Sequence, residues 1–572
     1  MLAVVLTVFM LLCAQPAIHR AEKENAMAST PGTQNSAHIS ETETNVAAEI
    51  TFTARRSYAD PFQDVTLDVV FVEPEGKSRR VPAFWAGGST WKVRYSSSVS
   101  GKHPWKSVCS AGDDPRLNGV EGVVQVRRYQ GSNPLFVRGP VRVASDHRHF
   151  EYADGTPFFW LGDTWWMGLC NRLHWPEEFA QLTADRKAKG FNLIQIVAGL
   201  YPDMPPFDPR GANEAGFPWE ADYARIRPEY FDAADRRLQY LVDQGMTPCI
   251  VGAWGYFLPW MGVPKMEAHW RYLIARYAAW PVVWCAAGEA NLPWYLARGF
   301  PYDDREQARE WTKILQFIRA TDPYRRPLTI HSTAINQYTA RHAADDPTLL
   351  DFDMLQTPHG QREAVPITVR AVRDSMAAKP VMPVINGEAA YERLSDRLPT
   401  EWTRAMFWLC MMNGAKGHTY GANGIWQLNR KEQPYGASPH GGNYGLIAWD
   451  EAMHLPGSQQ MGYGKQFFES LPWDHLTPMP DTAAWETPAG EDPLFAPQAC
   501  GIGDRIRAIY SVAAQPIIVK ALRPKTAYSL TWFDPVSGKR STGETVHSGD
   551  NGEWHCPAPA HDHDFVVLLE AR

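Results

Sequence analysis

The sequence predicts an α/β protein: a (β/α)8 TIM barrel flanked by an N-terminal and a C-terminal β-sandwich domain. Three observations lead to this fold class. Between residues 138 and 480, eight apolar runs of strand length alternate with segments of helical periodicity. On both sides of that region, short strand-like runs are separated by Gly, Asp, Pro and Ser. Two of the eight apolar runs end in Gly-Glu, and the exits of barrel strands are where such folds carry functional residues.

The predicted barrel, residues 138–480, follows from the alternation itself. The expected strands are residues 158–163, 191–199, 246–255, 282–291, 327–331, 352–356, 381–385 and 414–420. The expected helices are residues 176–189, 228–244, 266–279, 304–320, 367–378, 401–412 and 457–470. Insertions are expected after the second and eighth strands. The alternative is an open doubly wound sheet, which would carry a Gly-rich phosphate loop after its first strand. Gly162-Asp163-Thr164-Trp165-Trp166 stands there instead, and this favours the barrel.

Two β-rich regions flank the barrel. Residues 49–130 contain strand-like runs at 50–54, 65–72, 91–95 and 122–126, and residues 495–572 contain them at 506–511, 516–519, 529–533 and 565–569. Turn-forming residues separate these runs, which is typical of antiparallel β-sandwiches. Residues 22–48 are rich in Ala, Ser, Thr, Asn and Glu and poor in large apolar residues, so they are predicted to form a flexible leader.

The first residues resemble an export signal. Residues 2–14 are almost entirely apolar and too few to span a bilayer, so residues 1–21 are predicted to be a signal peptide and the protein to be periplasmic or secreted. A lipoprotein anchor on Cys13 is not favoured, because Leu12 stands where a small residue is needed. No later run is long and apolar enough to be an integral membrane segment.

Composition narrows the choice of partners. The net charge is −7 and no basic stripe occurs, which argues against nucleic acid and anionic membranes. The chain has 23 Trp, 22 Tyr and 24 Phe; these rings either fill large cores or form platforms that stack on sugars. Cys500 and Cys556 could pair in an exported protein, although the scattered cysteines do not form a disulfide framework. No zinc motif occurs, so no cofactor or metal is predicted, and nothing indicates an oligomeric state.

The two Gly-Glu strand ends, Glu289 and Glu388, are the predicted catalytic residues. Cleaving a glycosidic bond needs one carboxyl group to protonate the leaving oxygen and a second to attack the anomeric carbon or activate water. Strands four and seven lie across the barrel from each other, so their terminal carboxylates can converge on one substrate. Either Glu alone could instead be a capping or ion-paired residue, and Glu392 is the alternative carboxylate.

The other strand ends carry amides, imidazoles and aromatic rings that suit sugar hydroxyls and ring faces. Asp163 is expected to accept hydrogen bonds beneath the sugar, and Asn291 either holds a hydroxyl or satisfies the backbone at a turn. His331 and His359 could form a metal site with His418, but no metal-ligand spacing supports it. Some of the Trp residues are expected only to pack. The predicted substrate-binding residues are Asp163, Trp165, Trp166, Trp254, Tyr256, Asn291, His331, Gln356, His359, Tyr391, Glu392 and Trp426.

Four segments, residues 150–166, 284–291, 386–392 and 457–476, resemble the apiosidase-like glycoside hydrolases. The resemblance implies a clan A type barrel between two β-sandwich domains. Residues 532–538 are similar to the family's C-terminal module, which is sometimes labelled as collagen-binding. The resemblance to the apiosidase-like family also implies a retaining mechanism with Glu289 as acid/base and Glu388 as nucleophile. Family members commonly carry Asp at the position of Glu289, so geometry at the leaving group is expected to differ here.

The leading hypothesis is therefore an exported glycoside hydrolase acting on plant or microbial polysaccharide, of which apiose release from pectin is the family's characterised example. One alternative is a glycosidase of another specificity, such as an arabinofuranosidase-like enzyme. Another is a carbohydrate-binding protein that has lost catalysis, which the presence of both carboxylates disfavours. A protease is disfavoured because no Gly-x-Ser-x-Gly or metalloprotease motif occurs.

Overall fold

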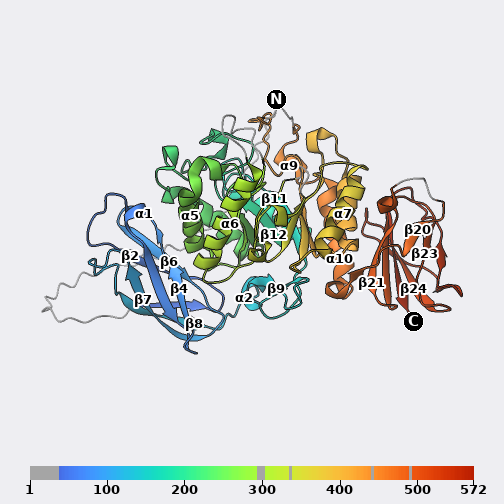
Figure 1. Ribbon diagram of the computed structural model, residues 1–572, viewed down its shortest axis with the longest axis horizontal. Helices are drawn as coiled ribbons and strands as arrows, with labels where there is room; N and C mark the ends of the chain where they lie inside the picture. Colours follow the sequence, from blue (N-terminus) through green and yellow to red (C-terminus); the bar gives the residue numbers. More distant parts are fainter. Residues whose placement is uncertain (1–37, 293–302, 334–337, 440–443, 488–491) are drawn as a thin grey trace, which may run out of the picture. The chain divides into compact units, whose positions relative to one another are not determined.

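The computed structural model describes residues 38–292, 303–333, 338–439, 444–487 and 492–572. The predicted signal peptide, residues 1–21, and residues 22–37 of the predicted leader lie outside the described residues. The elements are labelled in Figure 1, where helices α5, α6, α7 and α10 surround the barrel strands.

The N-terminal region consists of two sheets, ordered β1-β8-β7-β3-β4 and β2-β6-β5. Aromatic contacts join them across a shared core: Phe71 stacks on Tyr95, with ring centroids 3.9 Å apart, and Phe52 meets Trp105 edge-on at 5.7 Å. The strands are β1 His38–Glu43, β2 Ala48–Thr53, β3 Leu67–Val72, β4 Ser78–Pro82, β5 Phe84–Trp85, β6 Thr90–Tyr95, β7 Gly101–Cys109 and β8 Glu121–Arg127; the short helices are α1 Pro61–Asp64 and α2 Pro134–Val137.

Strand β1 corrects the predicted leader, which was expected to run from residue 22 to residue 48. Residues 38–43 instead pair in parallel with β8, from His38 opposite Gly122 to Glu43 opposite Arg127. The strand lies at the edge of its sheet, and Ile39 is 71% exposed. An edge strand is held by backbone hydrogen bonds and needs little apolar sequence, which is why its composition resembles that of a flexible segment.

The central sheet has eight parallel strands, in the order β15-β14-β13-β12-β11-β18-β17-β16. Between its two ends, the Leu328 N–H donates to the Asp351 carboxylate and Thr329 Oγ1 donates to Phe352 O, both at 2.8 Å, so the sheet curves round to form the predicted TIM barrel. The strands are β11 Trp160–Trp165, β12 Leu193–Val197, β13 Thr247–Val251, β14 Val283–Cys285, β15 Leu328–Thr329, β16 Asp353–Gln356, β17 Val384–Glu388 and β18 Gly417–Tyr420.

Helices follow most of the barrel strands, as the alternation predicted. They are α3 Glu177–Ala188, α4 Pro228–Asp243, α5 Phe257–Tyr277, α6 Asp304–Thr321, α7 Ala364–Ala377, α8 Thr400–Met412, α9 Trp449–Ala452 and α10 Pro456–Glu469. Between β15 and β16 the described residues form two 3-10 helices, Ala340–His342 and Pro347–Leu349, in place of a full helix. Strands β9 Val141–Val143 and β10 Phe150–Tyr152 form a hairpin just before β11.

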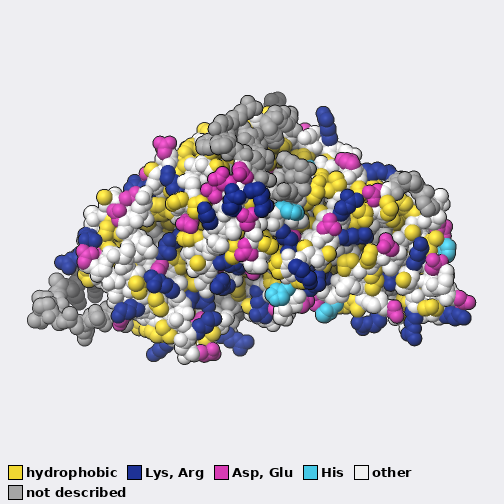
Figure 2. All heavy atoms as spheres, viewed as in Figure 1, with side chains coloured by type: hydrophobic (Ala, Val, Ile, Leu, Met, Phe, Trp, Pro, Cys, Tyr) yellow, Lys and Arg dark blue, Asp and Glu magenta, His cyan; other side chains and the backbone are white. Residues whose placement is uncertain are grey.

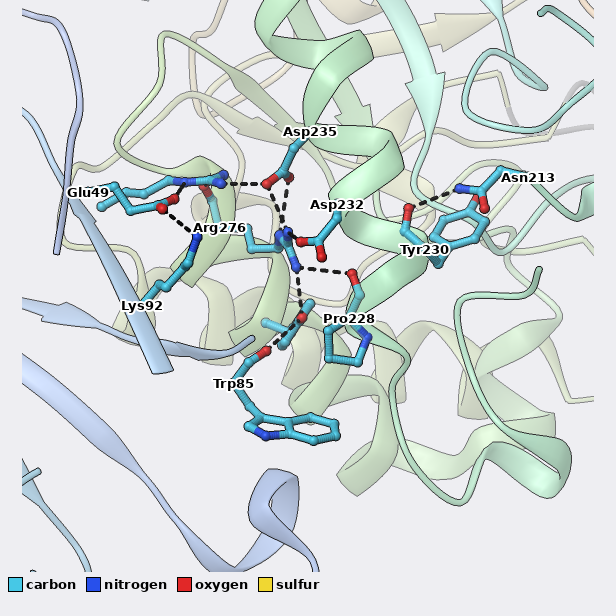
Figure 3. Close-up of polar contacts among 11 residues, drawn as sticks. Glu49, Trp85, Lys92, Asn213, Pro228, Tyr230, Asp232, Asp235 and Arg276 are labelled. Carbon is cyan, nitrogen blue, oxygen red and sulfur yellow. Dashed lines mark hydrogen bonds and ion pairs between the residues drawn. The ribbon is translucent and has the colours of Figure 1, made fainter. Parts of the chain in front are cut away.

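A buried ionic network joins the N-terminal sheets to the barrel (Figure 3). Arg94 of β6 and Arg276 of α5 both bind the carboxylate of Asp235 in α4, and Arg94 also donates to Glu49 at 3.0 Å. Burial opposes ionisation of Asp235, but the two guanidinium groups outweigh it and hold its pKa well below the usual range. Removing one member of such a network leaves an unpaired buried charge, so breaking these contacts between the two regions is costly.

The C-terminal region forms a second pair of sheets, ordered β19-β21-β22-β28-β24-β25 and β20-β23-β27, with β26 paired to β24. It packs on the barrel through Trp408 of α8, which stacks on Tyr510 at 5.7 Å, and through an Arg404–Asp564 ion pair. Cys500 and Cys556 lie in different sheets, and both thiols are free and buried. The strands are β19 Thr477–Pro478, β20 Ala483–Trp485, β21 Gln498–Ile502, β22 Ile506–Ser511, β23 Ile517–Val519, β24 Ala527–Phe533, β25 Arg540–Thr542, β26 Val546–His547, β27 Trp554–Cys556 and β28 Phe565–Ala571.

On the face shown in Figure 2, acidic and basic side chains are interspersed, in keeping with the small net charge. Within the described ranges, every helix is too short or too polar to cross a membrane.

Candidate active site

The first Gly-Glu lies just beyond β14. Gly288 pairs with Trp254 of the neighbouring strand exit, and a Cβ on Gly288 would lie 2.2 Å from the Trp254 ring. Only glycine therefore allows the indole to lie against this backbone. Trp254 Nε1 then donates to Glu289 Oε2 at 3.2 Å, and Gln356 Nε2 donates to Oε1 at 2.9 Å. Glu289 itself has a φ of 42°, in the left-handed region, a strain of the kind found at functional sites.

The second Gly-Glu ends β17. A Cβ on Gly387 would lie 2.5 Å from Met354 Cγ, so glycine is again required by close packing. Glu388 is 6% exposed, and two imidazoles face its carboxylate. His359 Nε2 lies 2.9 Å from Oε1, and His331 Nε2 lies 3.3 Å from Oε2. Glu388 thus lies among potential cations, whereas Glu289 is bound by neutral donors.

The backbone fixes the orientation of both imidazoles. The Glu289 N–H donates to Nδ1 of His331 at 3.5 Å, and the Tyr391 N–H donates to Nδ1 of His359 at 3.4 Å. Because each Nδ1 accepts, the proton of each neutral ring is on Nε2, which faces Glu388. The contacts of His331 therefore run from the backbone of one glutamate to the carboxylate of the other.

Because of these surroundings, the two carboxyl groups have different pKa values. Burial raises the pKa of Glu289 to about 7, and the charge of Glu388 adds to the rise, while the Gln356 amide opposes it. Burial also opposes ionisation of Glu388, but His331 and His359 outweigh it and lower its pKa to about 2. Glu388 is therefore ionised near neutral pH, while Glu289 keeps its proton to a higher pH than an ordinary carboxyl group. A proton donor together with an ionised carboxylate is the pair that glycoside hydrolysis requires.

Two further predicted residues lie beside this pair. Trp166 meets Trp254 at 5.4 Å and His331 at 5.9 Å between ring centroids, both edge-on. Tyr391 packs edge-on against His359 at 4.6 Å, and burial, followed by the charge of Glu388, raises the pKa of its phenol.

Four predicted binding residues have other tasks in the structure. Asp163 is fully buried and accepts from Arg186 Nε at 2.5 Å and Trp165 Nε1 at 2.7 Å, which places both Asp163 and Trp165 in a buried ion-pair cluster. Glu392 is likewise buried and binds Thr400, Tyr420 and the Gly457 N–H. The Tyr256 hydroxyl donates to Tyr201 O at 2.7 Å. These positions differ from the predictions, because strand-end placement does not say toward which side a side chain points.

Two other predictions concern the turn and the metal. Asn291 Oδ1 accepts the Thr333 N–H at 3.0 Å, which is the backbone role left open for it. His418 lies in β18 and packs against Phe407, with ring centroids 5.6 Å apart. Over the residues that the structure describes, no three His, Cys, Asp or Glu side chains are grouped to hold a metal ion.

Sequence reasoning missed Asp203, in the loop after β12. Asp203 is 6% exposed with a φ of 54°, and its carboxylate accepts from Ser438 Oγ at 3.1 Å and Tyr444 Oη at 2.6 Å. Its charge also adds to the rise in the pKa of Glu289. The only available signal was the predicted insertion after the second strand, because the loop has no periodicity that would single out one residue. Trp426, which was predicted, lies beside this group and packs on Tyr444 at 4.8 Å.

The barrel and its paired carboxylates define the class of protein, a glycoside hydrolase. More particularly, residues 144–475 match the family model described as apiosidase-like, catalytic domain, and the chain belongs to this family. Residues 43–110 match a domain of unknown function, DUF5060. A search of curated proteins returned no match.

Solved structures share the fold. A protein described as a glycoside hydrolase is 23% identical with a TM-score of 0.63 over 77% of this chain and 98% of its own. A glycoside hydrolase family 5 protein from Bacteroides vulgatus is 22% identical, with a TM-score of 0.64 over 77% and 94%. A further Bacteroides vulgatus protein reaches a TM-score of 0.67 at 18% identity, covering 93% of this chain and all of its own.

Proposed function

We propose that this glycoside hydrolase cleaves plant or microbial polysaccharide with retention of anomeric configuration, Glu388 being the nucleophile and Glu289 the acid/base. The observation that carries the proposal is the difference between the two carboxyl environments: two imidazoles hold Glu388 ionised, while burial and the charge of Glu388 favour the proton on Glu289.

The roles follow from the charges. The ionised Glu388 attacks the anomeric carbon as Glu289 gives its proton to the glycosidic oxygen, so the bond to the leaving group breaks and a glycosyl ester forms on Glu388. Glu289, now ionised, takes a proton from water, which attacks the anomeric carbon and releases Glu388. Glu388 would carry no charge in the ester, so its electrostatic repulsion of an ionised Glu289 would be lost after the first step. The pKa of Glu289 would therefore fall, as a base in the second step requires.

The test combines product identity with stereochemistry. Purified protein is incubated with a panel of pectic, other plant and microbial polysaccharides, and released sugars are identified. For a polymer that is cleaved, proton NMR follows the first anomer formed. We expect the anomer of the substrate linkage; the opposite anomer contradicts a nucleophilic Glu388, and binding without release of any sugar indicates a carbohydrate-binding protein.

Export is a further part of the proposal, supported by the apolar residues 2–14. Expression of the full chain in a Gram-negative host, followed by N-terminal sequencing, tests it. We expect a mature chain beginning near residue 22, recovered from the periplasm or the medium. An intact first residue on protein found only in the cytoplasm contradicts this prediction.

A further inference from the structure

Two long loops rise from strands that lie on either side of β11. The loop after β12 runs from residue 198 to the start of α4, and the described residues of the loop after β18 are 421–439 and 444–448. In the sheet, β11 has β12 as one neighbour and β18 as the other. The segment after β11 binds both loops: the Asn171 N–H donates to Ala212 O at 2.8 Å, and Arg172 Nη2 donates to Gln433 O at 2.8 Å.

Hydrogen bonds join the loops directly. Tyr444 Oη and Ser438 Oγ, from the loop after β18, bind opposite oxygens of the Asp203 carboxylate at 2.6 and 3.1 Å. Tyr435 Oη donates to Pro202 O at 3.3 Å, and Arg210 Nη1 returns a hydrogen bond to Tyr435 O at 3.0 Å. A buried carboxylate with hydroxyl donors on both oxygens is costly to break, so the junction is firm.

Aromatic packing fills the junction. Trp426 lies edge-on to Tyr444 at 4.8 Å and contacts Tyr435 at 5.5 Å between ring centroids. Tyr435 is also covered by the guanidinium groups of Arg210, at 4.8 Å, and Arg172, at 5.3 Å. Tyr435 and Trp426 are each 4% exposed. We call Asp203, Trp426, Tyr435, Ser438 and Tyr444 the loop wall.

The loop wall has a defined place relative to the reacting carboxylates. Glu289 follows β14 and Glu388 ends β17, with β15 and β16 between them on one side of the ring and β13, β12, β11 and β18 on the other. A sugar chain that passes between two facing carboxylates must run across the line joining them. In this ring, that path leads from the β15–β16 side to the β11–β12 side, where the loop wall stands. The Met167 N–H, next to Trp166, donates to Trp426 O at 3.4 Å, and Trp166 packs on His331, whose Nε2 lies 3.3 Å from Glu388, so the loop wall lies close to the chemistry.

We propose that the loop wall ends the substrate path and makes the enzyme exo-acting: it admits one terminus of a polysaccharide and removes the terminal sugar. The inference rests on the proposed hydrolysis at Glu289 and Glu388. A chain closed off at one end of its path cannot be cleaved internally, because the bond to be broken must lie one sugar away from the obstruction.

The test uses full-length protein and the polymer from which it releases sugar. We expect the monosaccharide as the sole early product, with polymer viscosity falling only in proportion to sugar released. Oligosaccharides of the same linkage are then labelled with a fluorophore on the terminal sugar of one end or the other. One of the two labels is expected to abolish cleavage. A ladder of oligosaccharide products, or cleavage of both labelled forms, contradicts exo action but is compatible with the proposed hydrolysis. Release of no sugar from any polymer contradicts the proposed hydrolysis itself.

A variant examines the loop wall directly. The double substitution Tyr435→Ala and Tyr444→Ala removes two of its rings. We expect this variant to cleave the oligosaccharide whose label blocks the unaltered protein about 10-fold faster than that protein does, equivalent to ~1.4 kcal/mol. Tyr129→Ala, which removes a ring that follows β8 and packs on Phe136 of α2, is the matched control and should leave the product pattern unchanged. Faster cleavage by the control but not by the double variant would count against the loop wall.

Discussion

Glu289 and Glu388 begin from the same local sequence, an apolar strand followed by Gly-Glu, and end in opposite electrostatic surroundings. Glu289 lies beyond its strand with a φ of 42° and accepts from an indole and an amide. Glu388 is still part of β17 and faces two imidazoles. The pKa of the first is raised and that of the second lowered. The comparison shows that residues from other strands, and not the motif, set which carboxyl group has the raised pKa and which has the lowered one.

Substituting Glu388 is expected to have the largest effect. Glu388→Gln keeps the shape and removes the ionised oxygen that attacks the anomeric carbon, so kcat should fall by ~10⁴-fold or more. Steady-state kinetics on the cleaved polymer measure this loss, and Glu469→Gln, a surface residue paired with Lys465, serves as the control. A Glu388→Gln enzyme within 10-fold of the unaltered rate would remove Glu388 from the mechanism.

Glu289→Gln should cost less, and its cost should depend on the leaving group. Loss of a general acid typically lowers the rate by about 10²–10⁴-fold. Aryl glycosides with acidic phenols need little protonation, so their first step should be largely spared, whereas the natural polymer should suffer the full loss. Comparing the two substrate types in pre-steady-state measurements tests this. Equal losses of rate on aryl glycosides and on the natural polymer would show that Glu289 is not the general acid, and its proposed role would no longer differ from that of Glu388 in this way.

The pH profile gives a third comparison. The proposed mechanism requires Glu289 protonated and Glu388 ionised, so activity should fall as pH rises through about 7 and fall again only in strong acid. His359→Gln removes one imidazole from Glu388, whose pKa then rises, and the acidic limb should move up by about one pH unit. His174→Gln, an exposed residue paired with Glu178, is the control. A shift of the basic limb alone would contradict the assignment of His359 to Glu388.

The smallest expected effect is on the basic limb. Gln356 Nε2 hydrogen-bonds Glu289 and favours its ionised form, so Gln356→Met should raise the pKa of Glu289 and extend activity to higher pH by less than about one unit. The surface substitution Gln239→Met, which loses only a hydrogen bond to Asp243, should leave the limb in place. If the basic limb moves to lower pH, Gln356 does not act as a donor to Glu289.

Much of the fold could be predicted because barrel strands and helices differ in period and in length. Strand β22 was expected at residues 506–511 and occurs there, and α4 was expected at 228–244 and ends one residue earlier. Strand β1 could not be found, since a polar edge strand lacks the apolar alternation that marks a buried one. Strand β7 was also missed; Pro104 lies in its middle, although the strand is central in its sheet.

The candidate site was predictable in part for the same reason. Counting strands placed Glu289 and Glu388 across one ring, and the structure gathers Trp254, His331, Gln356 and His359 around them. Counting could not separate a side chain that faces the centre from one that faces the helices, and Asp163 and Glu392 are bound up in buried contacts of their own. Asp203 could not be predicted from the sequence, because its hydrogen-bond partners lie more than 200 residues away in the chain.

The sequence by itself determined the barrel, its two flanking sheet regions and the position of two carboxylates at strand ends, because hydrophobic periodicity and turn residues are local properties. Only the tertiary structure decided what each carboxylate can do. The two imidazoles on Glu388, the indole and amide on Glu289 and the loop wall beside them come from separate strands and loops. Their effect depends on distances of about 3 Å that no local pattern encodes.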